Sequence, residues 1–146
     1  MNLKISSSQW QIFNWAVTKI TVPTASGEIS ILSWHQPLST IIVPWLLRVY
    51  LDPSFDGDTS SYITDAWAVV ISLSKGLMMT DGAQTTITTS LATTSINESE
   101  EVLSQMVKDM EIQLDAIRET GNAEDLEIAI WNIDKINADI RLSKLG

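Results

Sequence analysis

The sequence contains no cysteine. Disulfide bonds, zinc–thiolate sites and thiol nucleophiles are therefore excluded, and nothing in the composition indicates an oxidising compartment. Histidine is almost as scarce, because His35 is the single one. A metal site built on it would need carboxylates as its other ligands, and the HExxH spacing is missing. A packing or interface role is therefore favoured for His35 over catalysis.

Long apolar runs are also missing from the sequence. The most apolar stretch, residues 40–51, is interrupted by Pro44 and Arg48 and falls short of the roughly 20 residues that a spanning helix needs. Residues 1–5 show neither the basic region nor the apolar core of a signal peptide. We therefore expect no membrane-spanning segment and a chain that stays in the compartment where it is made.

Basic side chains are few, and the net charge is −9. The imbalance is concentrated near the C-terminus, because residues 1–96 carry 4 basic and 6 acidic side chains whereas residues 97–146 carry 5 and 12. Negative charge repels phosphate backbones, and no basic patch with interleaved aromatics is visible. We expect no nucleic-acid partner.

Motifs that carry catalysis or bind cofactors are missing as well. The sequence has no GxSxG, GxxxxGK[ST] or GxGxxG, so we assign no catalytic residue and expect no cofactor. Asp52, Asp56 and Asp58 surround Gly57 like a fragment of a calcium loop, but the DxDxDG order and the closing glutamate are missing, which favours a solvated turn. A small hydrolase that uses carboxylates such as Asp52 and Asp65 is a weak alternative.

The first two thirds of the sequence reads as short strands and turns. In residues 18–22 and 28–32 apolar side chains recur at every second position, which places them on one face of a strand, with residues 23–27 as the turn. Sequence pairs that favour turns, such as Asp52-Pro53 and Asp81-Gly82, separate further predicted strands. The further predicted strands are residues 3–7, 46–51, 61–71, 77–80 and 84–90. This pattern is typical of a β-sandwich or a flattened barrel.

From residue 97 the apolar period becomes helical. Asn97 is predicted to cap a first helix with Glu100 completing a capping box, Gly121 to end it, and Asn122 to cap a second helix. Two helices joined by so short a link fold back antiparallel. The predicted packing residues between them, spaced by three and four, are Leu103, Val107, Met110, Leu114, Ile117, Ala129, Ile133, Ile136 and Ile140.

The fold class predicted from these observations is mainly β plus α. An N-terminal antiparallel β-sandwich over residues 1–92 is followed by an antiparallel two-helix hairpin over residues 97–146. The β part is rich in tryptophan, at positions 10, 15, 34, 45 and 67. Because aromatic anchors are enriched both in cores and at interfaces, some of these side chains are expected to face a partner.

Residues 20–38, which read ITVPTASGEISILSWHQPL, resemble the ATP synthase epsilon subunit, whose pattern is V-T-[LV]-P-[TG]-x-x-G-E-[IL]-x-[IV]-L-x-x-H-x-P-L. The similarity continues through residues 39–49, which look like the family's L-x-x-L-x-P-G-x-L-R-V. Trp45 stands where the family has glycine. The family's order of parts, a β-sandwich followed by two helices, is the order that the periodicity predicts.

The resemblance implies a non-catalytic subunit of the central stalk of a rotary proton-translocating ATP synthase. Such a subunit binds the gamma subunit and the c-ring and couples proton flow to ATP synthesis. It would lie on the cytoplasmic face of the bacterial inner membrane or at the plastid thylakoid equivalent; the mitochondrial counterpart is called delta. The candidate interface residues are Trp34, His35, Pro37, Leu38 and Trp45.

The C-terminal helices depart further from the family. ATP-binding members carry an I/L-D-x-x-R-A motif and arginines where this sequence has Glu100 and neutral residues over 128–132, so no ATP binding is expected. In bacterial members the hairpin can extend towards alpha and beta and hinder hydrolysis, partly through basic side chains. The candidates for that role are Lys108, Arg118, Lys135, Arg141 and Lys144. The alternative reading is a stand-alone β-sandwich binding module with a helical oligomerisation arm.

Overall fold

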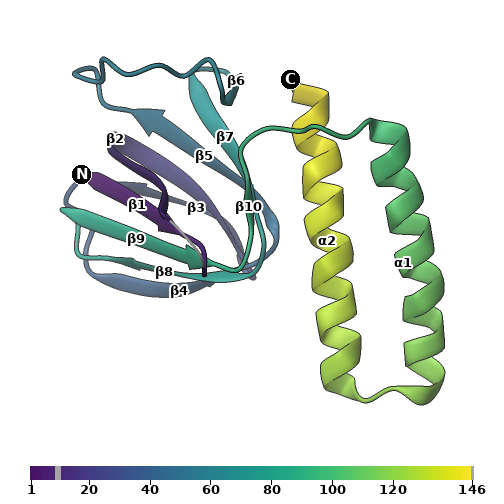
Figure 1. Cartoon of the computed structure of the whole chain (residues 1–146). Helices are drawn as coiled ribbons and strands as arrows, with labels where there is room; N and C mark the ends of the chain where they lie inside the picture. Colours follow the sequence, from purple (N-terminus) through teal and green to yellow (C-terminus); the bar gives the residue numbers. More distant parts are fainter. Residues whose placement is uncertain (9–10, 146) are drawn as a thin grey trace.

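A computed structural model describes residues 1–8 and 11–145. The strands lie in the first part of the chain and the helices in the last, as Figure 1 shows. The elements are β1 (Asn2–Ser6), β2 (Gln11–Thr24), β3 (Gly27–Leu32), β4 (Leu38–Ile42), β5 (Trp45–Leu51), β6 (Ile63–Asp65), β7 (Ala68–Leu73), β8 (Gly76–Thr80), β9 (Gln84–Thr89), β10 (Ala92–Thr93), α1 (Glu100–Thr120) and α2 (Ala123–Leu145). The predicted fold class, a β-sandwich followed by two helices, is confirmed.

Strand β2 is long enough to belong to both layers of the sandwich. Its first half pairs with β1, and its second half pairs with β3 and β5. The strands β1, β9, β8 and β4 follow one another in one layer, and β2, β5, β7 and β10 continue the order in the other. Because β2 also pairs with β4, the sheet closes on itself as a flattened barrel.

The core lies between the two layers and is built from alternate residues of the strands. Phe13, Ile20, Ile71 and Ile87 are among its members, and all are fully or almost fully buried. Beside it, the rings of Trp15, Phe55 and Tyr62 pack together, with Trp15 and Phe55 centroids 4.4 Å apart. This contact holds the long segment between β5 and β6 against β2.

The predicted strands over residues 3–7, 18–22, 28–32, 46–51, 77–80 and 84–90 are confirmed within one or two residues at their ends, except that residues 18–22 form only part of β2.

Two local predictions for the strands are wrong. Residues 61–71 are not one strand, because Ala66 and Trp67 take positive φ angles of 48° and 71° and turn the chain between β6 and β7. The turn after β2 is tighter than residues 23–27, since Pro23 still pairs with Glu28. Strand β4 and residues 11–17 of β2 were not predicted as strands at all.

The helical hairpin follows the predicted pattern apart from its first residue. Helix α1 begins two residues later than predicted, because the hydroxyl of Ser99 rather than Asn97 accepts the capping hydrogen bond, from the Val102 amide at 3.2 Å. Gly121 ends α1, and the Asn122 side chain caps α2 by accepting from the Asp125 amide at 2.8 Å. The division of the chain into residues 1–92 and 97–146 stays a prediction.

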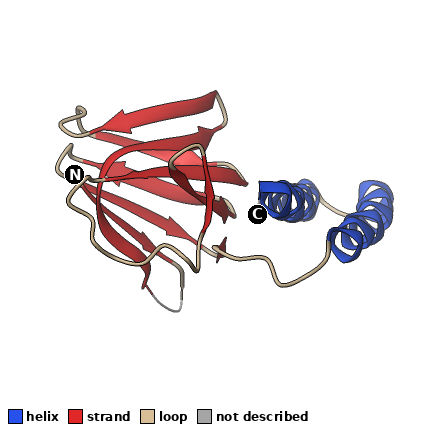
Figure 2. Cartoon of the chain, turned by 90° about the horizontal axis from the view of Figure 1, so that it is seen from above, coloured by secondary structure: helices blue, strands red, loops and turns tan. Residues whose placement is uncertain are grey.

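The two helices differ in what they contact. Helix α2 packs against β5, β6 and β7, and α1 packs against α2. Figures 1 and 2 show α1 on the far side of α2 from the sandwich. The strands therefore hold the hairpin through α2. Neither helix, within the described part of the chain, combines the length and apolar character that a membrane crossing requires.

Candidate docking surfaces

The predicted interface residues do not form one surface. Trp34 and Pro37 are exposed in the turn between β3 and β4, and His35 beside them is half-buried. Leu38 instead packs against the sandwich core. Trp45 begins β5, next to the opposite end of β4, and is therefore separated from Trp34 by the length of that strand. Contact of these residues with a partner stays a prediction.

The turn at Trp34 is held in an unusual conformation by its neighbours. Trp34 has a positive φ of 68° and its side chain is 84% exposed. Its amide donates to the Gly82 carbonyl oxygen at 2.8 Å, and the His35 amide donates to the Leu32 carbonyl oxygen at 3.1 Å. The Nδ1 atom of His35 lies 2.7 Å from the Gln36 carbonyl oxygen. The indole is thus held out in solvent by backbone contacts.

Gly82 makes this turn possible, and its replacement gives the first prediction. Its φ is +92°, and an added β-carbon would lie 2.6 Å from the His35 carbonyl oxygen. We expect Gly82→Ala to lower the free energy of unfolding by about 2–3 kcal/mol in urea denaturation, through strain and displacement of the turn. Gly27→Ala is the matched control, because its φ is +109° but nothing lies within 4 Å of an added β-carbon. An equal loss for both variants would contradict the role given to Gly82.

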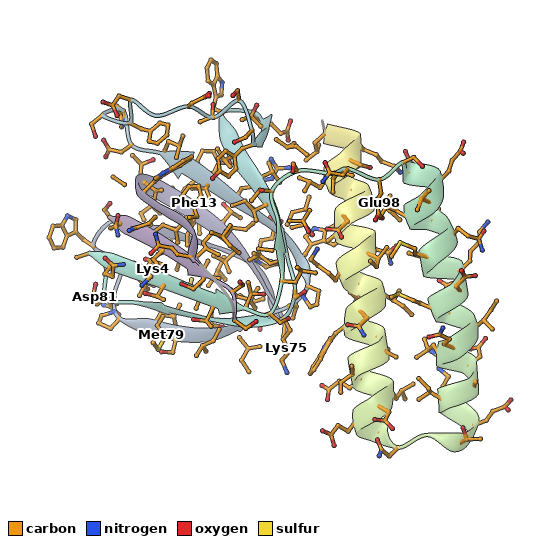
Figure 3. The ribbon with its side chains drawn as sticks, viewed as in Figure 1. Lys4, Phe13, Lys75, Met79, Asp81 and Glu98 are labelled. Carbon is orange, nitrogen blue, oxygen red and sulfur yellow. The ribbon has the colours of Figure 1, made fainter. Side chains whose placement is uncertain are left out.

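An exposed apolar face, made of Ile41, Leu77 and Met79, was not predicted. Ile41 on β4 pairs directly with Leu77 on β8, and Met79 lies two residues further along the same face of β8. Their exposed fractions are 55%, 43% and 51%. Figure 3 shows Met79 on the outside of the sandwich. The sequence already indicated this face. A strand with one face in water normally alternates apolar and polar residues, whereas β8 has apolar residues on both of its faces.

Among the residues that the structure describes, Trp67 is the most exposed of the large apolar ones, at 97%. It occupies the tight turn between β6 and β7, next to the ion pair in which Arg48 lies 2.8 Å from Asp65. Trp15 is half-buried in the aromatic group already described. The prediction made for Trp10 lies outside the described residues. The tryptophans therefore divide between packing and exposed positions.

The acidic side chains of the loop after β5 are used locally. Asp52 accepts from the Ser54 side chain and amide, and these bonds lower the pKa of its carboxyl group. Asp58 accepts from the Ser60 amide and side chain, with the same effect on its pKa. Among the described residues no group of three metal-ligating side chains is arranged to hold an ion. The carboxylates organise turns here.

The hairpin residues predicted to pack together are all at least half-buried, and their contact with one another stays a prediction. Leu103, Leu114 and Ile133 are buried, and the other six, Val107, Met110, Ile117, Ala129, Ile136 and Ile140, are half-buried. The outer end of the interface between the helices leaves a cavity of about 300 Å³, lined by residues that include Met110, Ile117 and Asn132.

A second face of α2, which was not predicted, contacts the sandwich. Ala138 and Leu142 are fully buried against Leu46 of β5 and Val70 of β7, and we call these four residues the α2 docking site. Lys135, one of the basic candidates for contact with beta, is buried beside them, and its role in such a contact stays a prediction. On the rim, the ammonium of Lys75 lies 3.5 Å from the centre of the Trp131 ring. Figure 3 shows Lys75 on the side of the sandwich that faces the hairpin.

Asp134, next to this face, gives a prediction about pH. Burial raises the pKa of its carboxyl group above 3.8. The folded chain therefore binds more protons than the unfolded chain just above pH 3.8, so this group's contribution to stability falls as pH rises through that window. We expect Asp134→Asn to stabilise the chain at pH 7, by under about 1 kcal/mol because solvent screens a partly exposed group, and to have no effect at pH 3. Urea denaturation at both pH values measures this, and stabilisation at pH 3 alone would contradict it.

Taken together, the fold and these surfaces define a class of protein, a β-sandwich with exposed apolar contact surfaces and a docked helical hairpin. The profile of the ATP synthase delta/epsilon chain β-sandwich domain matches residues 1–95. The chain belongs to the ATP synthase delta/epsilon chain family.

Comparisons with individual proteins agree with this assignment. The chain is 35% identical over 49 residues to the ATP synthase epsilon chains of Neisseria meningitidis serogroups B and C, which is 34% of this chain and 35% of each relative. The match thus spans about a third of these relatives' length.

Two solved structures are similar in fold. A chain in the Euglena gracilis mitochondrial ATP synthase, in an assembly of OSCP, F1 and c-ring, superimposes with a TM-score of 0.66 at 15% identity, covering 93% of this chain and 76% of that one. A chain in the central stalk and c-ring of the Tetrahymena thermophila mitochondrial enzyme gives a TM-score of 0.51 at 9% identity, covering 70% and 69%.

Proposed function

We propose that this protein is a non-catalytic central-stalk subunit of a rotary proton-translocating ATP synthase, which binds gamma and the c-ring and couples proton flow to ATP synthesis. Membership of the delta/epsilon family, matched over residues 1–95, is the observation that carries the proposal. It would act on the cytoplasmic face of a bacterial inner membrane or at its thylakoid equivalent. ATP binding by the hairpin is not part of this function.

The exposed apolar face of β4 and β8 is the surface we assign to gamma. Ile41, Leu77 and Met79 would be covered in the complex, which removes apolar area from water. The turn that carries Trp34 and His35 is separate from this face and is assigned to the c-ring. Mixing the purified chain with purified gamma should give a one-to-one complex in sedimentation; two unassociated species would overturn the assignment.

A further role in restraining ATP hydrolysis is favoured by the way the hairpin is attached. Helix α1 packs on α2, and the α2 docking site contains four buried apolar residues, with the partly buried Ile63, Ile96 and Leu145 packed against them. A hairpin held by so small a site is able to leave it and reach alpha and beta. Loosening the site with Leu142→Ala should therefore slow ATP hydrolysis by the assembled enzyme severalfold. An unchanged rate of ATP hydrolysis would contradict the restraining role and leave coupling as the only proposed function of the subunit.

A further inference from the structure

A charged side chain lies in the middle of the face that α2 presents to the sandwich. The positions along this face are spaced by four and three residues, as in any helix that packs lengthwise. They are Trp131, Lys135, Ala138, Leu142 and Leu145. Ala138 and Leu142 are fully buried, and Lys135, between them and Trp131, is only 4% exposed. Burying a charge at such a position costs its hydration.

The ammonium group of Lys135 has one partner on its own helix and one on the sandwich side. Its Nζ atom lies 2.6 Å from Oδ1 of Asp139, one turn further along α2, and donates to Oγ1 of Thr93 on β10 at 2.8 Å. Burial lowers the pKa of Lys135, while Asp139 acts in the opposite direction. Since the Lys135–Asp139 pair is contained within α2, docking adds only the hydrogen bond to Thr93.

The strand surface beneath the pair is also partly polar. Thr93 pairs with Ser72 of β7, and Ser72 pairs with Leu46 of β5, so these three side chains form a row on one face of the sheet. Leu46 places this row under α2, because it belongs to the docking site. Ser72 is fully buried, and its hydroxyl has no hydrogen-bond partner among the described residues. The surface under α2 is thus less favourable to bury than an apolar one.

The energetic consequence follows from what docking changes. In an undocked α2, water hydrates the Lys135–Asp139 pair. Docking removes both charges from water. Because the two side chains already attract each other on the helix, docking adds no new ion pair to offset the lost hydration. A buried ion pair often contributes no more to stability than apolar side chains of the same size. A single polar residue in an otherwise apolar helix interface fixes the register of packing and lowers the stability of the contact. Removing only one partner leaves an unpaired buried charge, which is worse still.

We propose that the Lys135–Asp139 pair weakens the docking of α2 and fixes its position over Thr93, so that the hairpin leaves the sandwich readily and returns to one place. The pair is a conformational device of this chain, and only its consequence for hydrolysis rests on the proposed function. Replacing both charges with apolar groups tightens docking, and removing Asp139 alone releases the hairpin.

Ser72 offers a reporter, because the chain has no cysteine of its own. In the full-length Ser72→Cys variant the thiol is covered while α2 is docked and reacts with a maleimide only when α2 leaves. The labelling rate relative to that of a free thiol therefore measures the undocked fraction. Labelling as fast as a free thiol in this parent variant would itself overturn the proposal, since α2 would not cover the site.

Three further variants in this background test the pair. We expect Lys135→Met with Asp139→Leu to label at least about tenfold more slowly than the parent, and Asp139→Leu alone to label about a hundredfold faster. Lys108→Met, the same change at an exposed lysine of α1, should leave the rate unchanged. Faster labelling of the double variant, or no change with Asp139→Leu alone, would overturn the proposal.

Circular dichroism of each variant checks that helix content is retained, so that a fast rate reports undocking of an intact hairpin. The measurement uses the free chain and no other subunit. A failure here would leave the assignment to the central stalk untouched, and a failure to bind gamma would not alter the labelling rates.

Discussion

Leu77→Glu is expected to abolish binding of the purified chain to gamma while leaving the sandwich folded. Leu77 lies at the centre of the exposed apolar face, between Ile41 on the neighbouring strand and Met79 on its own. A carboxylate there would have to be buried without a partner in the complex, which costs several kcal/mol and raises the dissociation constant at least about a hundredfold. Because Leu77 is partly exposed, the free energy of unfolding should change by less than about 1 kcal/mol.

Titration calorimetry with gamma measures this effect, and Ser30→Glu provides the control. Ser30 is an exposed strand residue of β3, which pairs with β2 rather than with β4 or β8, so the same new charge is introduced away from the apolar face. Its dissociation constant should match that of the unaltered chain. If Leu77→Glu binds as tightly as Ser30→Glu, the apolar face is not the surface that contacts gamma.

Leu142→Ala is expected to release the hairpin from the sandwich. Leu142 is fully buried among Leu46, Val70 and Ala138, and truncating a buried leucine costs about 2–5 kcal/mol. The docking site is small and lies beside the buried Lys135–Asp139 pair, so this loss is comparable to the whole docking free energy. The sandwich core is a separate group of residues and should keep its stability.

The ring of Trp131 provides a direct readout of release. In the docked state the end of the Lys75 side chain lies over the Trp131 ring. The ring current therefore shifts the proton resonances of the Lys75 side chain. These resonances should return to ordinary lysine values in Leu142→Ala. Ile112→Ala is the control, since Ile112 is 69% exposed on α1, and it should leave them shifted. Shifted resonances in both variants would show that the site tolerates the loss of Leu142.

Much of the fold could be predicted because local signals agree with the tertiary structure. Gly121 and Asn122 lie between two helical apolar patterns, and the structure uses both residues as the sequence predicts. The turn at Ala66 and Trp67 could not be predicted, since neither residue favours a positive φ and the surrounding strands impose it. The predicted start of α1 is two residues early because Asn97 and Ser99 are both good capping residues, and the structure uses Ser99.

The surfaces were harder to predict than the fold. The spacing of the second face of α2 is as regular as that of the first, but Lys135 and Asp139 lie on it and resemble a solvent-exposed pair on a helix. The pair is buried because α2 docks on strands from much earlier in the chain, where Thr93, forty-two residues before Lys135, accepts a hydrogen bond from it. In the same way, Leu77 and Met79 could equally have been core residues until the pairing of β8 with β4 placed them outside.

Recovery of the tagged chain from detergent-solubilised membranes, with its bound proteins identified by mass, decides whether the chain is a central-stalk subunit. We expect gamma, alpha, beta and c to be recovered together with it, and Leu77→Glu to recover far less of all four. Recovery of a monodisperse chain alone, or of copies of itself joined through the helices, would contradict the assignment to the central stalk and favour a stand-alone binding module.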